Sequence, residues 1–136
     1  MNVPPPSQAR VVIVGATGMV GGCALRYALN HPAVGGVTAI GRRKVGTPHV
    51  RLKEVVHQDF ADCSTLADAF SDQDAVIFCL GAYTGAVPDT ELRKITVDYP
   101  IELARVLRAA SPAALFLLER QRRGPDGKKP AGVRAL

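Results

Sequence analysis

The fold of this chain is decided by the stretch Val11-Val12-Ile13-Val14-Gly15-Ala16-Thr17-Gly18-Met19-Val20-Gly21-Gly22. Its four consecutive β-branched apolar residues predict a strand that is buried on both faces, as in a parallel sheet. Three glycines follow at three-residue intervals, and a helical pattern begins directly behind them. A strand, a glycine turn and a helix start in this order are typical of a site for the phosphates of a dinucleotide. The alternative is a plain strand-to-helix turn without a ligand.

Each glycine of the triplet has its own expected role. Gly15 lets the chain turn sharply, and Gly18 leaves no side chain between the backbone and a pyrophosphate. Gly21 allows the helix to lie close to the strand. The unpaired N–H groups and the positive dipole end of that helix would then face the phosphates.

The rest of the chain alternates between strand and helix patterns. In the first half we expect a helix over 19–30, a turn at 35–36, and strands over 37–40 and 54–60 with a loop over 45–53 between them. A short helix over 64–70, capped by Ser64, and a strand over 74–81 should follow. The last expected elements are a helix over 89–110, with a kink or break at Pro100, and a strand over 113–118. This alternation predicts the α/β class, as a doubly wound parallel sheet (Rossmann-like) of about five strands.

Composition divides the chain into three parts. Residues 1–10 contain Pro4-Pro5-Pro6 and predict a flexible N-terminal arm, 11–118 the folded domain, and 119–136 an irregular basic tail rich in Gly and Pro. The net charge is +5, and most of it belongs to that tail. The nearly neutral body makes a nucleic-acid-binding face unlikely, and the tail is expected to be a solvated charge run. Nucleic-acid binding through the tail is a remote alternative.

The cysteines and the hydropathy pattern predict a cytoplasmic protein. No apolar run approaches the roughly 18 residues of a membrane span, and residues 1–10 do not form a secretory signal. Cys23, Cys63 and Cys79 are odd in number and lack CxxC spacing, which argues against a disulfide framework or a zinc site. Cys23 and Cys79 are expected to be small buried residues. The three histidines show no spacing typical of metal ligands, so no metal site is predicted.

Two arginines follow the second predicted strand. In a dinucleotide-binding fold this position meets the adenosine ribose, where an acidic residue would bind the free 2′-hydroxyl of NAD. The sequence there is Gly41-Arg42-Arg43-Lys44, without an acid. Because the guanidinium fork suits a phosphate, the pair predicts NADP, with NAD as the alternative cofactor. A solvated basic turn would explain the same residues.

Two further loops are expected at the same edge of the sheet. Asp59 and Phe60 could line the adenine by a hydrogen bond and an apolar contact, although Asp59 could equally serve a turn. Gly81 and Ala82 would permit close approach of the nicotinamide half. Tyr83 is either a lid or a surface aromatic.

Several motifs resemble one family in combination. The segments 12–21, 40–43, 78–81 and 97–99 resemble the atypical and extended short-chain dehydrogenases/reductases, in particular the branch of Tat-interacting-protein oxidoreductases and their bacterial NAD(P)-binding relatives. The likeness runs over 11–118. It implies an NAD(P)-binding Rossmann domain whose cofactor-binding residues are Gly15, Ala16, Thr17, Gly18, Met19, Val20, Gly21, Arg42, Arg43, Asp59, Phe60, Leu80, Gly81, Ala82 and Tyr83.

The chain departs from that family where catalysis would be expected. The family places a serine after the fifth strand and a Tyr-x-x-x-Lys pair on the next helix, whereas Leu118 is followed by Glu119-Arg120-Gln121. No tyrosine of this chain has a lysine four residues later, so no catalytic residue is predicted. Motif loss and the change of composition coincide at Leu118, and we expect a chain truncated there, for instance by a change of reading frame.

Two functions remain after this reading. The first is an NADP-favouring cofactor domain of an oxidoreductase with little or no turnover on an unidentified small-molecule substrate. The alternative is a non-catalytic dinucleotide-sensing or partner-binding module. In either case the fifth strand could be an exposed apolar edge through which copies of the chain associate.

Overall fold

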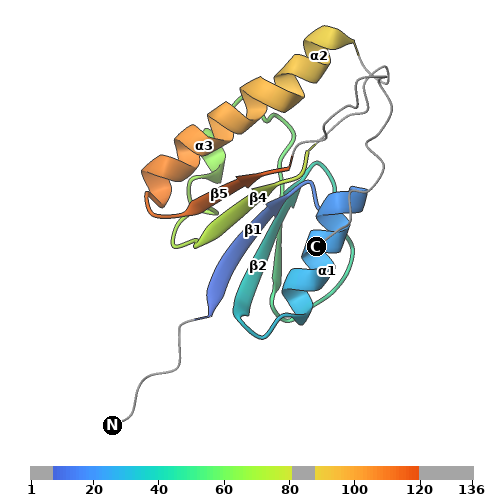
Figure 1. Ribbon diagram of the computed structural model, residues 1–136, viewed down its shortest axis with the longest axis vertical. Helices are drawn as coiled ribbons and strands as arrows, with labels where there is room; N and C mark the ends of the chain where they lie inside the picture. Colours follow the sequence, from blue (N-terminus) through green and yellow to red (C-terminus); the bar gives the residue numbers. More distant parts are fainter. Residues whose placement is uncertain (1–7, 81–87, 120–136) are drawn as a thin grey trace, which may run out of the picture.

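Five parallel strands form one sheet in the order β3-β2-β1-β4-β5 (Figure 1). The computed structural model describes residues 8–80 and 88–119. The strands are β1 (Ala9–Val14), β2 (Val34–Gly41), β3 (Leu52–Val56), β4 (Ala75–Phe78) and β5 (Leu115–Leu118). The chain winds from β1 outward to β3 on one side and then through β4 and β5 on the other. The predicted doubly wound parallel sheet is confirmed.

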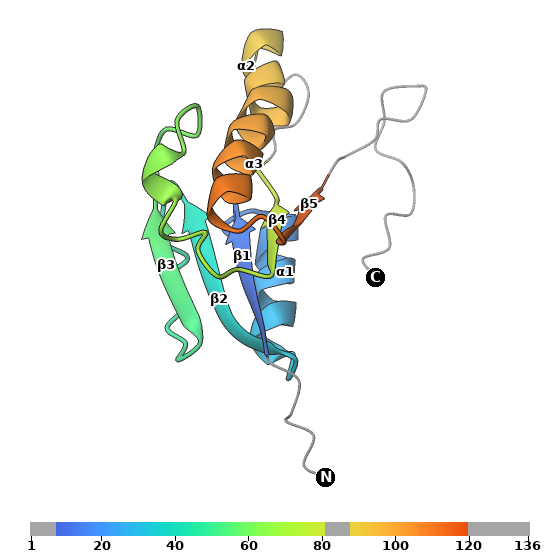
Figure 2. The same ribbon diagram turned by 90° about the vertical axis from the view of Figure 1, so that its left-hand side faces the viewer.

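Helices cover both faces of this sheet (Figures 1 and 2). The helix α1 (Met19–Asn30) connects β1 to β2, with the bounds that the sequence pattern predicts. On the opposite face, α2 (Asp89–Arg93), the π-helical turn η2 (Lys94–Asp98) and α3 (Tyr99–Ala110) form one continuous rod between β4 and β5. The short 3₁₀ turn η1 (Ser64–Leu66) lies between β3 and β4.

The central strand β1 separates two apolar cores. Val11 and Ile13 pack with Leu25 and Leu29 of α1 on one face. Val12 and Val14 lie in the other core, which includes Leu103, Val106 and Leu107 of α3. Since alternate side chains of a strand point to opposite faces, a strand between two helical layers must be apolar at every position. The predicted burial of β1 on both faces is confirmed.

Two expected boundaries in the β2–β3 region are wrong. Gly35 and Gly36 form part of β2 rather than a separate turn, and the strand continues through them with a register irregularity opposite Ala9 and Arg10. The third strand begins at Leu52, inside the expected loop, and ends at Val56. At this end β2 pairs with β1 alone, through Val34 opposite Ala9 and Gly36 opposite Arg10, and this pairing outweighs the local turn preference of the two glycines.

The expected helix over 64–70 is only the single turn η1. Ser64 does not cap it; instead, Asp62 accepts hydrogen bonds from both the backbone N–H and the hydroxyl of Ser64, at 3.0 and 2.6 Å. At Pro100 the helix does not break. The irregularity is the π-helical turn η2, which directly precedes α3, and Pro100 lies in the first turn of α3, where its missing N–H is tolerated.

All three cysteines are free thiols, but they differ in exposure. Cys63 is buried and Cys79 is half-buried. The expectation that Cys23 is buried is wrong, because it lies on the solvent side of α1. The helical face that contacts the sheet is formed instead by Gly21, Leu25, Ala28 and Leu29.

Candidate functional site

The turn between β1 and α1 requires glycine at two positions. Gly15 has a φ of +88°, and a Cβ there would stand 2.9 Å from the carbonyl carbon of Cys79. At Gly21 a Cβ would come within 2.0 Å of the Gly15 carbonyl oxygen, so the first turn of α1 lies directly against the preceding loop. Both contacts are with backbone atoms, which cannot rotate away. These two glycines therefore serve the internal geometry of the turn.

Gly18 has no such internal reason to be glycine. An added Cβ would meet only the Gly15 oxygen, at an ordinary contact distance of 3.5 Å. Gly18 and its neighbours Thr17 and Met19 are exposed at the carboxyl edge of the sheet. No side chain caps the N-terminus of α1, and no acidic residue lies in its first turn. An exposed, uncapped helix N-terminus beside an unobstructed glycine is suited to an anion such as a pyrophosphate.

The arginines after β2 lie on the neighbouring strand end. Arg42 and Arg43 are both exposed. A shallow hollow brings Arg43 and Lys44 together with Thr17 of the glycine turn. The hollow is lined by Ala16, Thr17, Ala39, Ile40, Gly41, Arg43, Lys44, Val45, Glu54 and Val55. Two elements separated in sequence thus form one surface, and Arg42 stands beside it.

Sequence reasoning missed the acid in this hollow. Glu54 is on β3, and its carboxylate accepts a hydrogen bond from the backbone N–H of Val45. It therefore holds the segment that follows the two arginines against the sheet. Glu54 is the first residue of the strand expected over 54–60, but only the pairing of β2 with β3 brings it close to Arg43.

The loop over 57–63 follows β3 and contains Asp59 and Phe60. Asp59 is exposed, and one of its carboxylate oxygens accepts the N–H of Ala61 at 3.0 Å, which is a turn role. The ring of Phe60 is fully buried and meets the ring of His57 edge-on at 5.1 Å. Because this ring has no exposed surface, it offers adenine no apolar contact in this conformation. Contacts of this loop with a base would come from Asp59 and the backbone.

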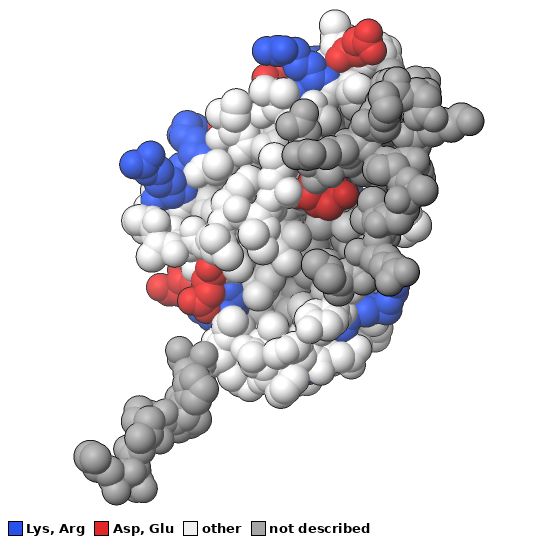
Figure 3. All heavy atoms as spheres, viewed as in Figure 1, with Lys and Arg blue, Asp and Glu red and all other residues white. Residues whose placement is uncertain are grey.

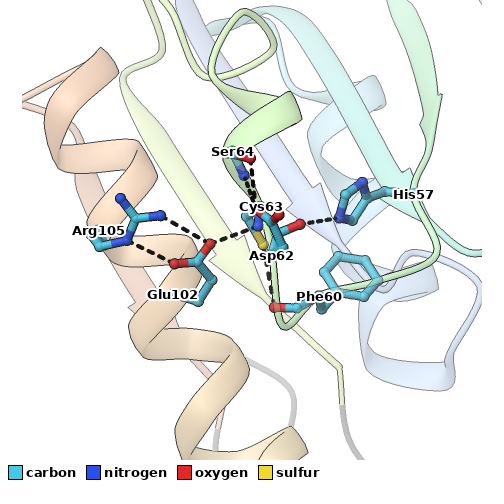
Figure 4. Close-up of polar contacts among 7 residues, drawn as sticks. All are labelled: His57, Phe60, Asp62, Cys63, Ser64, Glu102 and Arg105. Carbon is cyan, nitrogen blue, oxygen red and sulfur yellow. Dashed lines mark hydrogen bonds and ion pairs between the residues drawn. The ribbon is translucent and has the colours of Figure 1, made fainter.

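The 57–63 loop and the arginine segment are joined directly. The side-chain amide of Gln58 donates a hydrogen bond to the carbonyl oxygen of Arg42 at 2.9 Å. The same loop also contacts α3: the backbone N–H of Cys63 donates a hydrogen bond to the carboxylate of Glu102 at 2.7 Å (Figure 4). Neither Gln58 nor Glu102 carries a sequence signal of a site residue, since both bonds join segments far apart in the chain.

Leu80 is the last described residue before the gap at 81–87, and its half-buried side chain packs against the larger core. This places it at the carboxyl edge of the sheet, beside the glycine turn, where Cys79 donates its N–H to Val14 at 2.8 Å. The predicted site residues Gly81, Ala82 and Tyr83 lie outside the described residues.

Two cysteines of the described part of the chain, the buried Cys63 and the half-buried Cys79, have raised thiol pKa values. Burial, and secondarily the charge of Glu102, raises the pKa of the Cys63 thiol to about 12, and burial raises that of Cys79 to about 11. Neither sulfur is therefore an activated nucleophile at neutral pH. Within residues 8–80 and 88–119, no three His, Cys, Asp or Glu side chains are grouped so that they could hold a metal ion.

Residues 8–80 and 88–119 carry charges of both signs. On the face shown in Figure 3, the basic side chains are scattered and interspersed with acidic ones. That distribution differs from the continuous basic surface typical of nucleic-acid binders. Within residues 8–80 and 88–119, no helix has the length and apolar character needed to cross a membrane.

Solved structures of similar fold include three bacterial proteins. A short-chain dehydrogenase family protein from Francisella tularensis is 12% identical, with a TM-score of 0.71 over 89% of this chain and 56% of its own. A variant of uronate dehydrogenase from Agrobacterium tumefaciens in complex with NAD is 18% identical, with a TM-score of 0.63 over 81% of this chain and 40% of its own. A short-chain dehydrogenase/reductase superfamily protein with bound NAD, also from A. tumefaciens, is 26% identical, with a TM-score of 0.58 over 80% and 31%.

The chain thus spans about half or less of the length of these neighbours. Most of this chain nevertheless matches one protein family: residues 15–114 match the model of the NAD(P)H-binding family. The match begins at the first glycine of the turn and extends through α3 to the residue before β5. Together with the glycine turn, the strand order and the open N-terminus of α1, it shows that this chain belongs to the NAD(P)H-binding family, with a Rossmann fold whose solved structural neighbours include short-chain dehydrogenases.

Proposed function

We propose that this chain is the cofactor-binding part of an oxidoreductase and that it prefers NADP(H) to NAD(H). When bound, the nicotinamide would supply or accept hydride, and the chain would hold the cofactor in place. Thr17, Gly18 and Met19 would bind the pyrophosphate, and Asp59 the adenine.

The observation that carries the NADP preference is the exposed pair Arg42 and Arg43 at the end of β2. Arg43 and Lys44 line the same hollow as Thr17, so a cofactor held on the glycine turn would place its adenosine ribose near these cations. The acid in the hollow, Glu54, is engaged by the N–H of Val45. Paired guanidinium groups favour a 2′-phosphate, whereas the free ribose of NAD would gain little from them.

Titration of the full chain with NADPH and with NADH tests this proposal. We expect tighter binding of NADPH, and we expect Arg42→Ala/Arg43→Ala to weaken NADPH at least about tenfold, because hydrogen bonds between charged groups contribute roughly 1.5–3 kcal/mol. NADH binding should change much less. Fluorescence of the reduced nicotinamide reports both affinities.

The matched control is Arg10→Ala/Arg108→Ala. It removes the same charge from two exposed arginines, one at the start of β1 and one in the last turn of α3, at the opposite edge of the sheet. An equal loss of NADPH affinity in this control would reduce the effect to net charge and contradict the proposal. Equal affinities of the wild-type chain for NADPH and NADH would contradict it too.

The proposal extends to environment and association. The three free thiols fit a reducing, cytoplasmic setting. Among the described residues, β5 is hydrogen-bonded to β4 alone, and we propose that it pairs with β5 of a second copy of the chain. A non-catalytic dinucleotide sensor would bind cofactor in the same way, and it would be recognised by a partner whose binding changes with NADPH.

A further inference from the structure

The 57–63 loop is joined by one carboxylate to helix α3, which packs in the same core as the loop. Glu102, in the first turn of α3, accepts a hydrogen bond from the backbone N–H of Cys63 at 2.7 Å. Thirty-nine residues separate the two in the chain. In Figure 4 the carboxylate lies between α3 and the loop.

Glu102 is itself held in place by Arg105. The Nε of Arg105 donates to one oxygen of Glu102 at 2.7 Å, and a second guanidinium nitrogen donates to the other oxygen at 3.2 Å (Figure 4). The Glu102 side chain is 15% exposed, whereas that of Arg105 is 66% exposed. A forked pair of this kind fixes the orientation of the carboxylate, so that one oxygen stays directed at the Cys63 amide.

Contacts inside the loop connect Cys63, which Glu102 holds, to the exposed residues of the loop. The Cys63 thiol donates to the carbonyl oxygen of Phe60 at 3.5 Å, and the buried Phe60 ring lies 6.2 Å from the ring of Tyr99 on α3. His57 bonds the carbonyl oxygens of Asp59 and Asp62, at 2.6 and 3.0 Å. The loop is therefore a closed, internally bonded unit rather than a free segment.

The same loop also supports the arginine segment, because Gln58 donates to the carbonyl oxygen of Arg42 at 2.9 Å. A displacement at Cys63 would consequently be felt at Asp59 and at Arg42. These are the two residues that the proposed function assigns to the adenine and to the 2′-phosphate.

We propose that Glu102 is a positioning residue for the adenosine half of the cofactor site: its hydrogen bond to Cys63 fixes the 57–63 loop from helix α3. The inference rests on the proposed function. Glu102 does not touch the cofactor in this arrangement. Because Glu102 already holds the loop before the cofactor binds, the loop loses less conformational freedom on binding, and the affinity is higher.

The test separates the two halves of the cofactor. We expect Glu102→Ala to weaken binding of 2′,5′-ADP, which carries the adenosine and the 2′-phosphate, about tenfold. Binding of nicotinamide mononucleotide should stay within about twofold of its wild-type value. Glu102→Gln keeps an acceptor for the Cys63 amide and should restore most of the affinity.

The matched control is Glu91→Ala. Glu91 forms an i,i+3 ion pair with Lys94 at 3.9 Å, the same spacing as the pair of Glu102 with Arg105. It lies on α2 and not at the loop. A merely electrostatic or helix-stabilising effect of Glu102 would be reproduced by this variant, whereas a positioning effect would not.

Cys63 provides a readout that does not depend on affinity. Its thiol is fully buried in the wild-type chain, and exposed Cys23 serves as an internal reference. Labelling with a thiol reagent, mapped by mass spectrometry, should proceed faster at Cys63 in Glu102→Ala, and 2′,5′-ADP should slow it. Amide exchange at Cys63 in the wild-type chain gives the same information should the alanine variant not fold.

The outcomes distinguish failure of this inference from failure of the proposed function on which it rests. Wild-type binding of 2′,5′-ADP that Glu102→Ala leaves unchanged, with unchanged Cys63 labelling, overturns the inference alone. A folded wild-type chain that binds neither 2′,5′-ADP nor NADPH overturns the proposed function, and the inference with it. Rapid amide exchange at Cys63 in the wild-type chain would show that the loop is not held, and would also overturn the inference.

Discussion

Gly18 and Gly21 are three residues apart in the same turn, yet they respond to different demands. A Cβ at Gly21 would lie 2.0 Å from a backbone oxygen, whereas one at Gly18 would be 3.5 Å from its nearest neighbour. Gly21 is therefore required by packing, whereas Gly18 is the glycine that the proposed function assigns to the pyrophosphate. The distinction can be tested with one substitution made at each position.

Gly21→Ala should destabilise the fold considerably more than Gly18→Ala. The clash at Gly21 forces α1 away from the loop, and overpacking of this kind costs about 1–3 kcal/mol or more. Gly18 is the N-cap of α1, where alanine is less favourable than glycine, so Gly18→Ala should cost about 0.5–1 kcal/mol and should also weaken NADPH binding. Urea unfolding and NADPH titration measure both quantities. Two variants of equal stability would contradict the packing role of Gly21.

The C-terminal end of α1 depends on a residue that no sequence motif marks. Arg51 precedes β3 and donates hydrogen bonds to the carbonyl oxygens of Leu29 and of Val34, the latter at 2.8 Å. A cation at this end compensates the negative pole of the helix and satisfies carbonyl groups that have no partner within it. The guanidinium therefore joins α1, the start of β2 and the start of β3.

Arg51→Ala should lower the free energy of unfolding by about 1–3 kcal/mol, because it leaves partly buried carbonyl groups without their donor. Arg51→Lys should recover only part of this loss, since an ammonium group cannot reach separate carbonyls as a fork does. Urea unfolding gives the values, and Arg108→Ala is the control for removal of a helix-terminal cation. A loss no larger than that of Arg108→Ala would rule out the bridging role.

The contact between α3 and the 57–63 loop should also depend on pH. Hydrogen bonds from Arg105, and then from the Cys63 amide, hold the pKa of Glu102 below its ordinary value of 4.5, while the nearby Asp62 opposes this effect. A folded-state pKa below the unfolded one contributes stability above the unfolded value, and that stability is lost as the pH falls through the folded pKa.

The wild-type chain should therefore lose stability below about pH 4.5, and Glu102→Gln should lose less over the same range. Asp62, whose pKa is lowered by the hydroxyl and the N–H of Ser64, contributes a similar slope in both proteins and cancels from the difference. Urea midpoints measured as a function of pH provide the comparison. Parallel curves for the two proteins would show that the Glu102 carboxylate does not stabilise this contact.

The two edges of the sheet differ in how well they resist further pairing. The edge strand β3 contains Lys53 and Glu54, and charges of this kind discourage a second strand from docking. The edge strand β5 is Leu115–Leu118, without a charge or a proline. Its residues Leu115, Leu117 and Leu118 are 58%, 46% and 48% exposed.

Self-association through β5 should therefore be sensitive to one charge. We expect Leu117→Lys to shift the chain toward the monomer, as measured by light scattering over a series of protein concentrations. Ile101→Lys is the control, because Ile101 is 64% exposed but lies on α3. Equal association of the wild type and Leu117→Lys would exclude this edge as the contact, as would an equal effect of Ile101→Lys.

The sequence by itself determined the features that depend on neighbouring residues. The strand at 11–14, the turn at Gly15 and the helix Met19–Asn30 follow from local periodicity and from the conformational freedom of glycine, and the structure confirms them. The alternation of elements was enough to predict the parallel sheet. The preference for NADP and the nicotinamide residues 81–83 stay predictions.

Only the tertiary structure decided the features that join distant segments. It extended β2 through Gly35 and Gly36, buried the ring of Phe60, and exposed Cys23. It also brought Glu102 to the amide of Cys63 and Arg51 to the end of α1. The physical reason is the same in each case: the free energy of these contacts belongs to pairs of residues far apart in the chain, and local sequence patterns contain no information on which pairs will meet.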